Sequence, residues 1–566
     1  MGLTKPDQPD FDIEEWRALP YFGRLRLMCV TWCTQGFGAP DVVYVLYIMK
    51  IVFYLGMFFV FAAVTPSLGG PTSFGQWWSA PLAFEKAILW TMMFEVMGLG
   101  CGSGPLTGHY GPMFPAMRHW LRPGTTRLRP FTWVPFTSGH RRNWFDVVLY
   151  ASLLVLLTRA LVSSGIGRGE LVPVIALLCV LGLRDKTIFL AARSEHYLLT
   201  AIVFIFATDL LAGAKAVQLV LWWGAATSKL NHHFPNVIAI MQSNSPIQRS
   251  TRLRRALYRD YPNDLRPSHL SAAVAHSATA VEFAFPLALA FTTSGTVHTI
   301  ALVTLVLFHL NIFLSIPMGV PLEWNLLFIY SGLVLFGAHG DVHFWSIDSP
   351  WLAGVLIGTV LMGPVLGSFR PDKISFLPAM RYYAGNWAAS VWLFRPGLMA
   401  RLDECITKSA PLPEIQLEGR IDPGTYDVTM ARGQAFRAMH LHGRALATLL
   451  PRMYSDLAET DPAVASLGPD AFEMIDGEMI AGMVLGWNFG DGHLHHEQLL
   501  AAVQAECGFE PGDLRCLFLE SQPIHRQRMQ WRVADAATGP LSDGYIEVRD
   551  LLELQPWGVT ADQTVG

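Results

Sequence analysis

Charged side chains are scarce in this 566-residue sequence. Asp, Glu, Lys and Arg make up 15% of it, where about 25% is typical of soluble proteins. Hydrophobic residues make up 52%, with 34 Phe and 18 Trp, and the mean hydropathy is +0.33. A chain of this length and composition does not form one ordinary soluble core. It indicates an integral membrane protein.

Several motifs are also missing, and each absence excludes a class of protein. The sequence has no phosphate-binding glycine motif, no serine nucleophile elbow and no nucleic-acid-binding patch. The first 40 residues lack the apolar core of a cleavable signal peptide. The cysteines show no paired spacing, which favours reduced, buried thiols over disulfides at Cys29, Cys33, Cys101, Cys179, Cys405, Cys507 and Cys516.

What the sequence does contain is a series of apolar runs. Crossing a bilayer takes about 20 helical residues, and ten runs are that long or nearly so. They predict an all-α polytopic membrane bundle of about ten transmembrane helices, at residues 42–64, 82–99, 146–165, 170–183, 194–212, 214–229, 270–291, 298–316, 322–337 and 351–367.

The arginines are concentrated in alternate connections between these runs. Six lie in the connection at 118–142 and five in the connection at 249–259, whereas the connections at 65–81 and 338–350 are neutral or acidic. Basic loops stay on the cytoplasmic side of a membrane. We therefore expect a multi-pass protein of the plasma membrane with both termini in the cytoplasm.

The charge balance changes along the chain and predicts more than one domain. Residues 1–400 contain 29 Lys and Arg against 20 Asp and Glu, a balance of +9, and residues 401–566 contain 12 against 25, a balance of −13. Aromatic and arginine side chains at the start suit a helix at the membrane surface. The predicted segments are an interfacial segment at 1–41, a transmembrane domain at 42–370, a linker at 371–410 and an acidic cytoplasmic domain at 411–566.

The C-terminal domain is predicted to be small and α+β. A helical pattern covers 432–453, and alternation typical of strands occurs at 517–519, 530–533 and 545–548. It also contains three nearby histidines, His493, His495 and His496. Such a cluster can bind a transition metal, but the spacing does not match the His-x3-His of helical zinc sites. We favour a solvated turn, and no metal cofactor is expected.

One stretch, 219–235, places protonatable side chains directly after a run of apolar ones. It begins as an apolar helix and ends in Lys229, Leu230, Asn231, His232 and His233. In a structural interpretation, Lys229 is a cation at a helix C-terminus near the lipid headgroups. In a functional one, a desolvated lysine acts as a base near neutral pH. The substrate-binding residues would then be Trp222, Trp223, Asn231, His232 and His233.

Two more ionisable residues lie deep in apolar runs. Glu282 lies within 270–291 and His309 within 298–316. Such residues are costly in a membrane and are functional candidates for that reason. Polar side chains also hold helices together, but that role seldom needs a charge. The predicted catalytic set is therefore Lys229, Glu282 and His309.

Three short motifs carry a resemblance to a known family. Trp223-Gly224-x4-Lys229-Leu230, then Glu282-x3-Pro286, then His309 followed by Gly319 and Trp324 resemble the order of motifs in vitamin K-dependent γ-carboxylase-like transmembrane proteins, over roughly residues 190–340. The resemblance implies that Lys229 is a base working with a reduced quinone, with His309 in the same cavity. Those carboxylases work on the lumenal side, so peptide carboxylation is not carried over. The whole chain is similar to an uncharacterised actinobacterial multi-pass membrane family.

These observations lead to two hypotheses of function. The first is a membrane-embedded enzyme acting on a lipophilic substrate, a quinone or an isoprenoid lipid, with Lys229 as the base. The second is a non-catalytic lipid carrier or envelope-assembly subunit, in which the same residues gate a lipid path or pair helices. Membrane lipid and a small lipophilic molecule are the expected partners, and nucleic acid is not.

Overall fold

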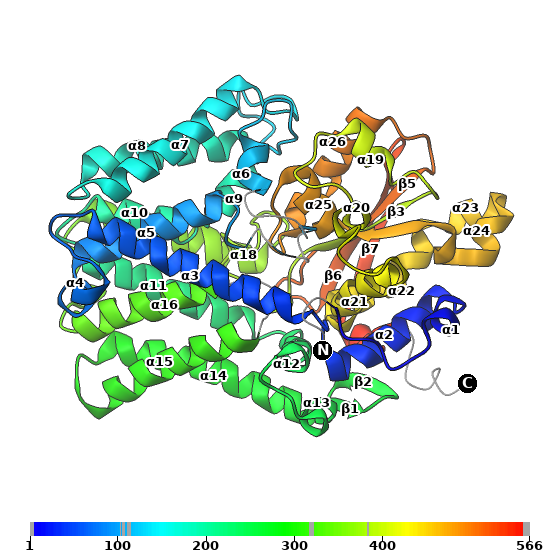
Figure 1. Cartoon of the computed structure of the whole chain (residues 1–566), viewed down its shortest axis with the longest axis horizontal. Coiled ribbons are helices and arrows are strands. Elements are labelled where there is room, and N and C mark those ends of the chain that lie inside the picture. The colour runs from blue at the N-terminus through cyan, green and yellow to red at the C-terminus, as the bar shows by residue number, and fades with distance from the viewer. Residues whose placement is uncertain are drawn as a thin grey trace.

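The computed structural model describes residues 5–101, 104, 108–109, 115–315, 322–381 and 384–558. They form two parts that pack together, a bundle of helices and a domain built around a β-sheet (Figure 1).

The apolar runs form the helices of the bundle. Within the described ranges, six helices are long and apolar enough to cross a membrane: α3 (Asp41–Ala63), α7 (Trp144–Val162), α11 (Leu210–Ser228), α14 (His269–Phe291), α15 (Gly295–Ser315) and the continuous helix Pro350–Phe369. The last consists of α17 (Pro350–Val360), a π-helical turn (Leu361–Val365) and α18 (Leu366–Phe369). The prediction of a helical membrane protein is therefore confirmed.

Ten spans remain a prediction. The other four predicted runs contain shorter helices, namely α5 (Pro81–Val96), α8 (Arg168–Arg184), α10 (Tyr197–Phe204) and α16 (Leu322–Gly332), which continues as a π-helix over Leu333–Ala338. The chain also leaves the helical conformation between Phe204 and Leu210, earlier than the predicted boundary. At this break the Asp209 carboxylate accepts hydrogen bonds from the backbone N–H groups of Asp348 and Ser349. Asp209 therefore joins two connections of the bundle.

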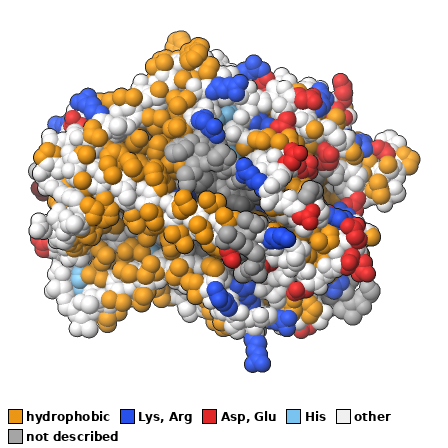
Figure 2. Space-filling view, in the orientation of Figure 1, with side chains coloured by type: hydrophobic (Ala, Val, Ile, Leu, Met, Phe, Trp, Pro, Cys, Tyr) orange, Lys and Arg blue, Asp and Glu red, His pale blue; other side chains and the backbone are white. Residues whose placement is uncertain are grey.

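The outer surface of the bundle is apolar. Figure 2 shows hydrophobic side chains gathered over the helices of the bundle, and most of the charged side chains over the sheet domain and the boundary between the two parts. The exposed side chains on the outer faces of α3, α14, α15 and α17 include Ile48, Val52, Phe291, Ile300, Leu307 and Ile357. A surface of this kind suits contact with lipid tails.

The N-terminal helices pack against the sheet domain. They are α1 (Ile13–Arg17) and α2 (Tyr21–Gln35), and α2 lies against α12 (Phe234–Asn244) and α21 (Tyr426–Met439). Trp16, Met28 and Trp32 are buried in these contacts. The N-terminal segment and the sheet domain thus lie on the same side of the bundle (Figure 1). Helix α13 (Thr251–Ala256) and the hairpin of β1 (Tyr258–Asp260) and β2 (Asp264–Pro267) lie there too.

A five-stranded antiparallel sheet forms the centre of the C-terminal domain, which confirms the predicted strands there. The strand order is β4-β3-β5-β6-β7, with β3 (Ala389–Phe394), β4 (Glu473–Asp476), β5 (Leu514–Leu519), β6 (Arg528–Asp535) and β7 (Gly539–Glu547). Strand β3 lies within the range predicted as a linker, 371–410, and pairs on both of its edges.

Helices cover both faces of this sheet. The helices of the domain are α19 (Arg401–Cys405), α20 (Pro413–Leu417), α21, α22 (Leu441–Leu449), α23 (Ser455–Thr460), α24 (Pro462–Leu467), α25 (Gly477–Leu485), α26 (Glu497–Cys507) and α27 (Val548–Leu552). On β3, Val391 and Leu393 belong to the core formed with α22 and α27. The alternate residues Trp392 and Phe394 belong to the core shared by α25, α26 and the bundle. Successive side chains of a strand point to opposite faces of the sheet. Strand β3 therefore contributes to both cores and connects the domain to the bundle.

Candidate functional site

Three helices bring the predicted catalytic residues around one cavity. Lys229 follows the last turn of α11, Glu282 lies in the middle of α14, and His309 lies in α15. All three line a cavity of about 90 Å³, several times the roughly 10–15 Å³ that one water molecule needs. Its other walls are mainly apolar and aromatic, with Trp222, Ala225, Phe234, Ile238, Phe308, Trp324 and Phe328.

Lys229 and Glu282 form an ion pair inside this cavity. The Lys229 Nζ donates to the Glu282 carboxylate, and the two residues are 8% and 3% exposed. The ammonium also lies 5.5 Å from the ring centre of Phe234 and 5.9 Å from that of Phe308, within cation–π range. Lys229 is therefore paired within the bundle.

The position of the pair along α14 places it well inside the bundle. Glu282 is the fourteenth residue of a 23-residue helix, about 20 Å along its axis from His269 at 1.5 Å per residue. Helix α11 can end at this depth because α12 follows it and packs against α14. The apolar run that ends at Lys229 thus stops inside protein, where the lysine meets a carboxylate.

His309 is held by hydrogen bonds at both ring nitrogens. Trp222 Nε1–H donates to His309 Nε2 over 2.9 Å, and His309 Nδ1 lies 2.9 Å from the Asn325 side-chain oxygen. The indole can only donate, so Nε2 accepts and the proton of the neutral ring is on Nδ1. The ring of Phe328 stacks on His309 with centres 5.1 Å apart. His309 therefore orients Trp222 at the cavity wall.

The predicted binding residues separate into two groups. Trp222 lines the cavity, whereas Trp223, Asn231, His232 and His233 lie outside its lining. Trp223 packs on the core of the bundle. His232 is exposed, while His233 is buried beside Gly385, at the boundary with the sheet domain. Only one of the five predicted binding residues is therefore placed to touch a molecule in this cavity.

The sequence did not identify several residues of the site. Asn325 and Trp324 at the start of α16, and Phe234 at the start of α12, line the cavity. The sequence signal was the group Glu323-Trp324-Asn325 at the start of an apolar run, whose polar members stand out for the same reason as Glu282. Gly319, which belongs to the motif of the resemblance, lies outside the described residues.

The three tail histidines bind other side chains and do not converge on one point. His493 Nε2 lies 3.1 Å from Glu520 and its Nδ1 lies 3.1 Å from the Ser375 hydroxyl. His495 Nδ1 lies 2.7 Å from the Ser390 hydroxyl, and His496 Nδ1 accepts from the Gln498 backbone. These partners explain the cluster through hydrogen bonding. The expectation of a solvated turn fits poorly, because His495 is fully buried.

The electrostatics of this cluster are dominated by His493 and Glu520. Burial opposes protonation of His493, but the adjacent Glu520 carboxylate outweighs it and raises the pKa of the imidazole. Burial likewise opposes ionisation of Glu520, yet His493 and the Ser521 N–H lower the pKa of this carboxyl to about 2. The pair is therefore a charged bridge between the loop after α25 and the end of β5.

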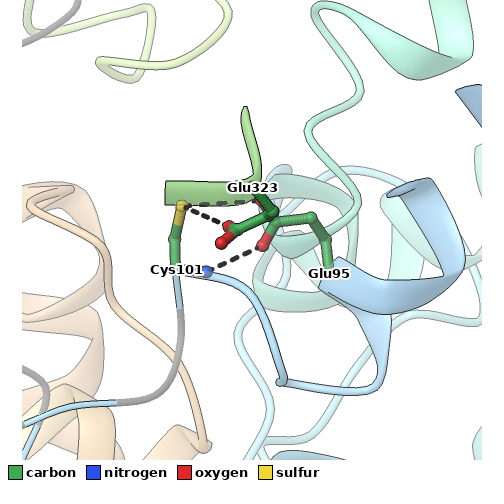
Figure 3. A group of neighbouring side chains, drawn as sticks. All are labelled: Glu95, Cys101 and Glu323. Atoms are coloured by element: carbon green, nitrogen blue, oxygen red, sulfur yellow. Dashed lines mark hydrogen bonds between the residues drawn. The ribbon is translucent and has the colours of Figure 1, made fainter. Parts of the chain in front are cut away.

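One other group has the residue types and spacing to hold a metal. Among the residues that the structure describes, Glu95, Cys101 and Glu323 alone place three ligand atoms within 4.8 Å of one another, and all three are fully buried (Figure 3). Glu323 is adjacent in sequence to Trp324 and Asn325 of the cavity, so the two sites share the start of α16.

Comparison with known proteins gives a family but no activity. The model of the family described as "Transmembrane protein of unknown function (DUF3556)" matches residues 1–565. No curated protein and no solved structure matches the chain. The similarity to γ-carboxylase-like proteins therefore depends on the three short motifs alone.

Proposed function

We propose that this chain, which belongs to the DUF3556 family of transmembrane proteins, is a membrane-embedded enzyme acting on a lipophilic substrate. The observation that carries the proposal is the meeting of Lys229, Glu282 and His309, from three helices, at one cavity inside an apolar bundle. A buried ion pair is seldom the most stable solution, because well-packed apolar residues in its place are often as stable or more stable. Its presence therefore favours a chemical role.

Lys229 is the proposed base. Proton transfer from its ammonium to the Glu282 carboxylate gives a neutral amine and a carboxylic acid, and a low dielectric disfavours the separated charges that compete with this form. The neutral amine can then remove a proton from a weakly acidic O–H or C–H group of a bound substrate. Lys229 is then an ammonium again, and Glu282 gives the first proton to the product or to water as the product leaves, which restores the ion pair.

The other cavity residues bind and orient the substrate. Trp222, fixed by His309, presents an indole face, and Phe308 and Phe328 add aromatic walls. These surfaces suit the ring of a quinol or the first unit of an isoprenoid. A reduced quinone is the cofactor or substrate that the γ-carboxylase resemblance implies, and this cavity is wide enough only for the reactive end of such a molecule.

We infer that a lipid-soluble substrate enters this cavity between α14 and α15. The cavity lining includes Ala278 and Ile312, which are half-buried, and Asn311, which is exposed, on these neighbouring helices. The tail of the substrate would remain among lipid chains between the two helices. The arginines near α13 lie on the same side as the sheet domain and the N-terminal helices. By the positive-inside rule we place this side in the cytoplasm, with the protein in the plasma membrane.

The test compares two lysine variants on the same helix. The full-length protein and its Lys229→Met and Lys215→Met variants are purified in mild detergent and examined by native mass spectrometry for bound lipids. Lipid extracts of the expressing cells are compared in parallel. Lys215 is an equally buried lysine that donates to the backbone carbonyls of His339 and Val342, away from the cavity.

We expect Lys229→Met to retain the bound lipophile and to abolish the change in extracted lipids that the wild type produces, while Lys215→Met leaves that change intact. A lipid profile that is the same for wild type and Lys229→Met would contradict the enzymatic proposal. Bound lipid with no chemical change would instead support the carrier hypothesis.

A further inference from the structure

A second buried site lies at the end of α5, away from the Lys229 pair. The loop after α5 returns Cys101 towards Glu95, and α16 brings in Glu323 (Figure 3). Gly100 leaves room for the Glu95 carboxylate, because a Cβ at this position would lie 2.0 Å from the Glu95 Oε2. All three side chains are 0% exposed.

Three ligand atoms point towards a common centre. The Cys101 Sγ lies 3.5 Å from Glu95 Oε1 and 3.7 Å from Glu323 Oε1. A tetrahedral metal with a metal–sulfur bond of about 2.3 Å and metal–oxygen bonds of about 2.1 Å separates sulfur from oxygen by roughly 3.6 Å. The two sulfur–oxygen separations bracket this value. They are therefore those expected of a metal centre.

The remaining atoms of these ligands are held from outside. Glu95 Oε2 accepts from the Cys101 backbone N–H over 3.0 Å, and Glu323 Oε2 lies 3.3 Å from the Lys50 Nζ. The Arg193 guanidinium donates to the Cys101 Sγ itself over 3.4 Å. Each of the three side chains thus has a partner that restricts its orientation, as outer hydrogen bonds do in metal sites.

One further observation concerns Tyr197. Its hydroxyl is fully buried and has no hydrogen-bond partner among the residues that the structure describes. A buried hydroxyl of this kind needs a water molecule or a bound ion as its partner.

We propose that Glu95, Cys101 and Glu323 bind one divalent transition-metal ion, with a water molecule in the fourth position. One sulfur and two carboxylate oxygens suit a borderline ion such as Zn²⁺ or Fe²⁺. Binding forms one metal–sulfur and two metal–oxygen bonds and releases the thiol proton to the buffer. The site is independent of the proposed base, because Lys229 contributes no ligand.

The test uses purified full-length protein, stripped with a chelator and titrated with Zn²⁺ or Co²⁺. We expect one equivalent to bind, and the Co²⁺ form to show the near-ultraviolet charge-transfer absorption of a thiolate ligand. This absorption is read on the wild-type protein and so does not depend on any variant folding. If neither ion binds, the proposal is wrong, and Glu95, Cys101 and Glu323 are held together by hydrogen bonds alone.

Variants locate the ion. Cys101→Ser and Glu323→Gln should lose it, and Lys50→Met should weaken binding roughly 10–100-fold, as expected for an outer partner. Cys516→Ala removes another fully buried thiol, in β5, and should bind as the wild type does. Lys229→Met should also retain the ion, which separates this proposal from the catalytic one. Unchanged binding in Cys101→Ser would place the ion elsewhere and refute the site.

Discussion

Removing one charge of the Lys229–Glu282 pair should destabilise the folded protein far more than removing both charges. In Lys229→Met the Glu282 carboxylate, 3% exposed, remains buried without its partner, and in Glu282→Leu the same is true of the ammonium. Leaving one charge of a buried pair typically costs about 3–5 kcal/mol. Replacing both by apolar residues of similar size is often neutral, or stabilising by about 1–4 kcal/mol. The double variant should therefore be more stable than either single variant.

The assay is thermal unfolding in detergent, followed by the fluorescence of the buried tryptophans. Both single variants should melt several degrees below the wild type, and the Lys229→Met/Glu282→Leu protein should melt near it. The double variant should nevertheless be inactive in the lipid comparison, because no base remains. It thus separates loss of chemistry from loss of folding.

The result that would refute this reasoning is a double variant destabilised by the sum of the two single effects. Additive losses are expected of residues that do not interact. They would show that Lys229 and Glu282 each have another partner, and that the pair does not form in the folded protein.

Two further predictions concern the sheet domain. The Glu520 pKa is lowered from its usual value near 4.5 to about 2, so its contribution to stability is present above pH 4.5 and is lost as the pH falls towards 2. The His493 pKa is raised above 6.5, so its contribution is complete below pH 6.5 and is lost at higher pH. The difference in melting temperature between wild type and Glu520→Gln should thus be largest between about pH 4.5 and 6.5, and a pH-independent difference would contradict the charged pair. The second prediction concerns Gly385, which has φ +69° and lies close to α12. Gly385→Ala introduces a Cβ 2.4 Å from Val237 Cγ2. It should therefore destabilise the protein by more than the roughly 1–2 kcal/mol that left-handed backbone strain alone costs. Gly397→Ala, at φ +80° with open space around it, should show the strain alone, and equal melting temperatures for the two variants would show that no close contact exists at Gly385.

The local sequence pattern was sufficient to predict the helices of the bundle. Each predicted apolar run contains a helix, because a backbone surrounded by hydrocarbon must satisfy its hydrogen bonds within the segment. The same logic singled out Lys229, Glu282 and His309, since a charge inside an apolar run is visible from its neighbours in sequence. Strand β3 was missed because all six of its residues are buried, so it shows no alternation of apolar and polar residues, and the prolines that follow it resemble those of a linker.

What the sequence alone determined is thus the membrane character of the chain and three ionisable residues buried in its bundle, Lys229, Glu282 and His309. Which of them meet was decided only by the tertiary structure. Lys229 and Glu282 are 53 positions apart, and Cys101 and Glu323 are 222 apart. No local periodicity relates such distant residues, because their contact depends on how separate helices pack. For the same reason Asn231 and His232, next to Lys229 in the chain, lie outside its cavity, whereas the distant Asn325 fixes His309 within it.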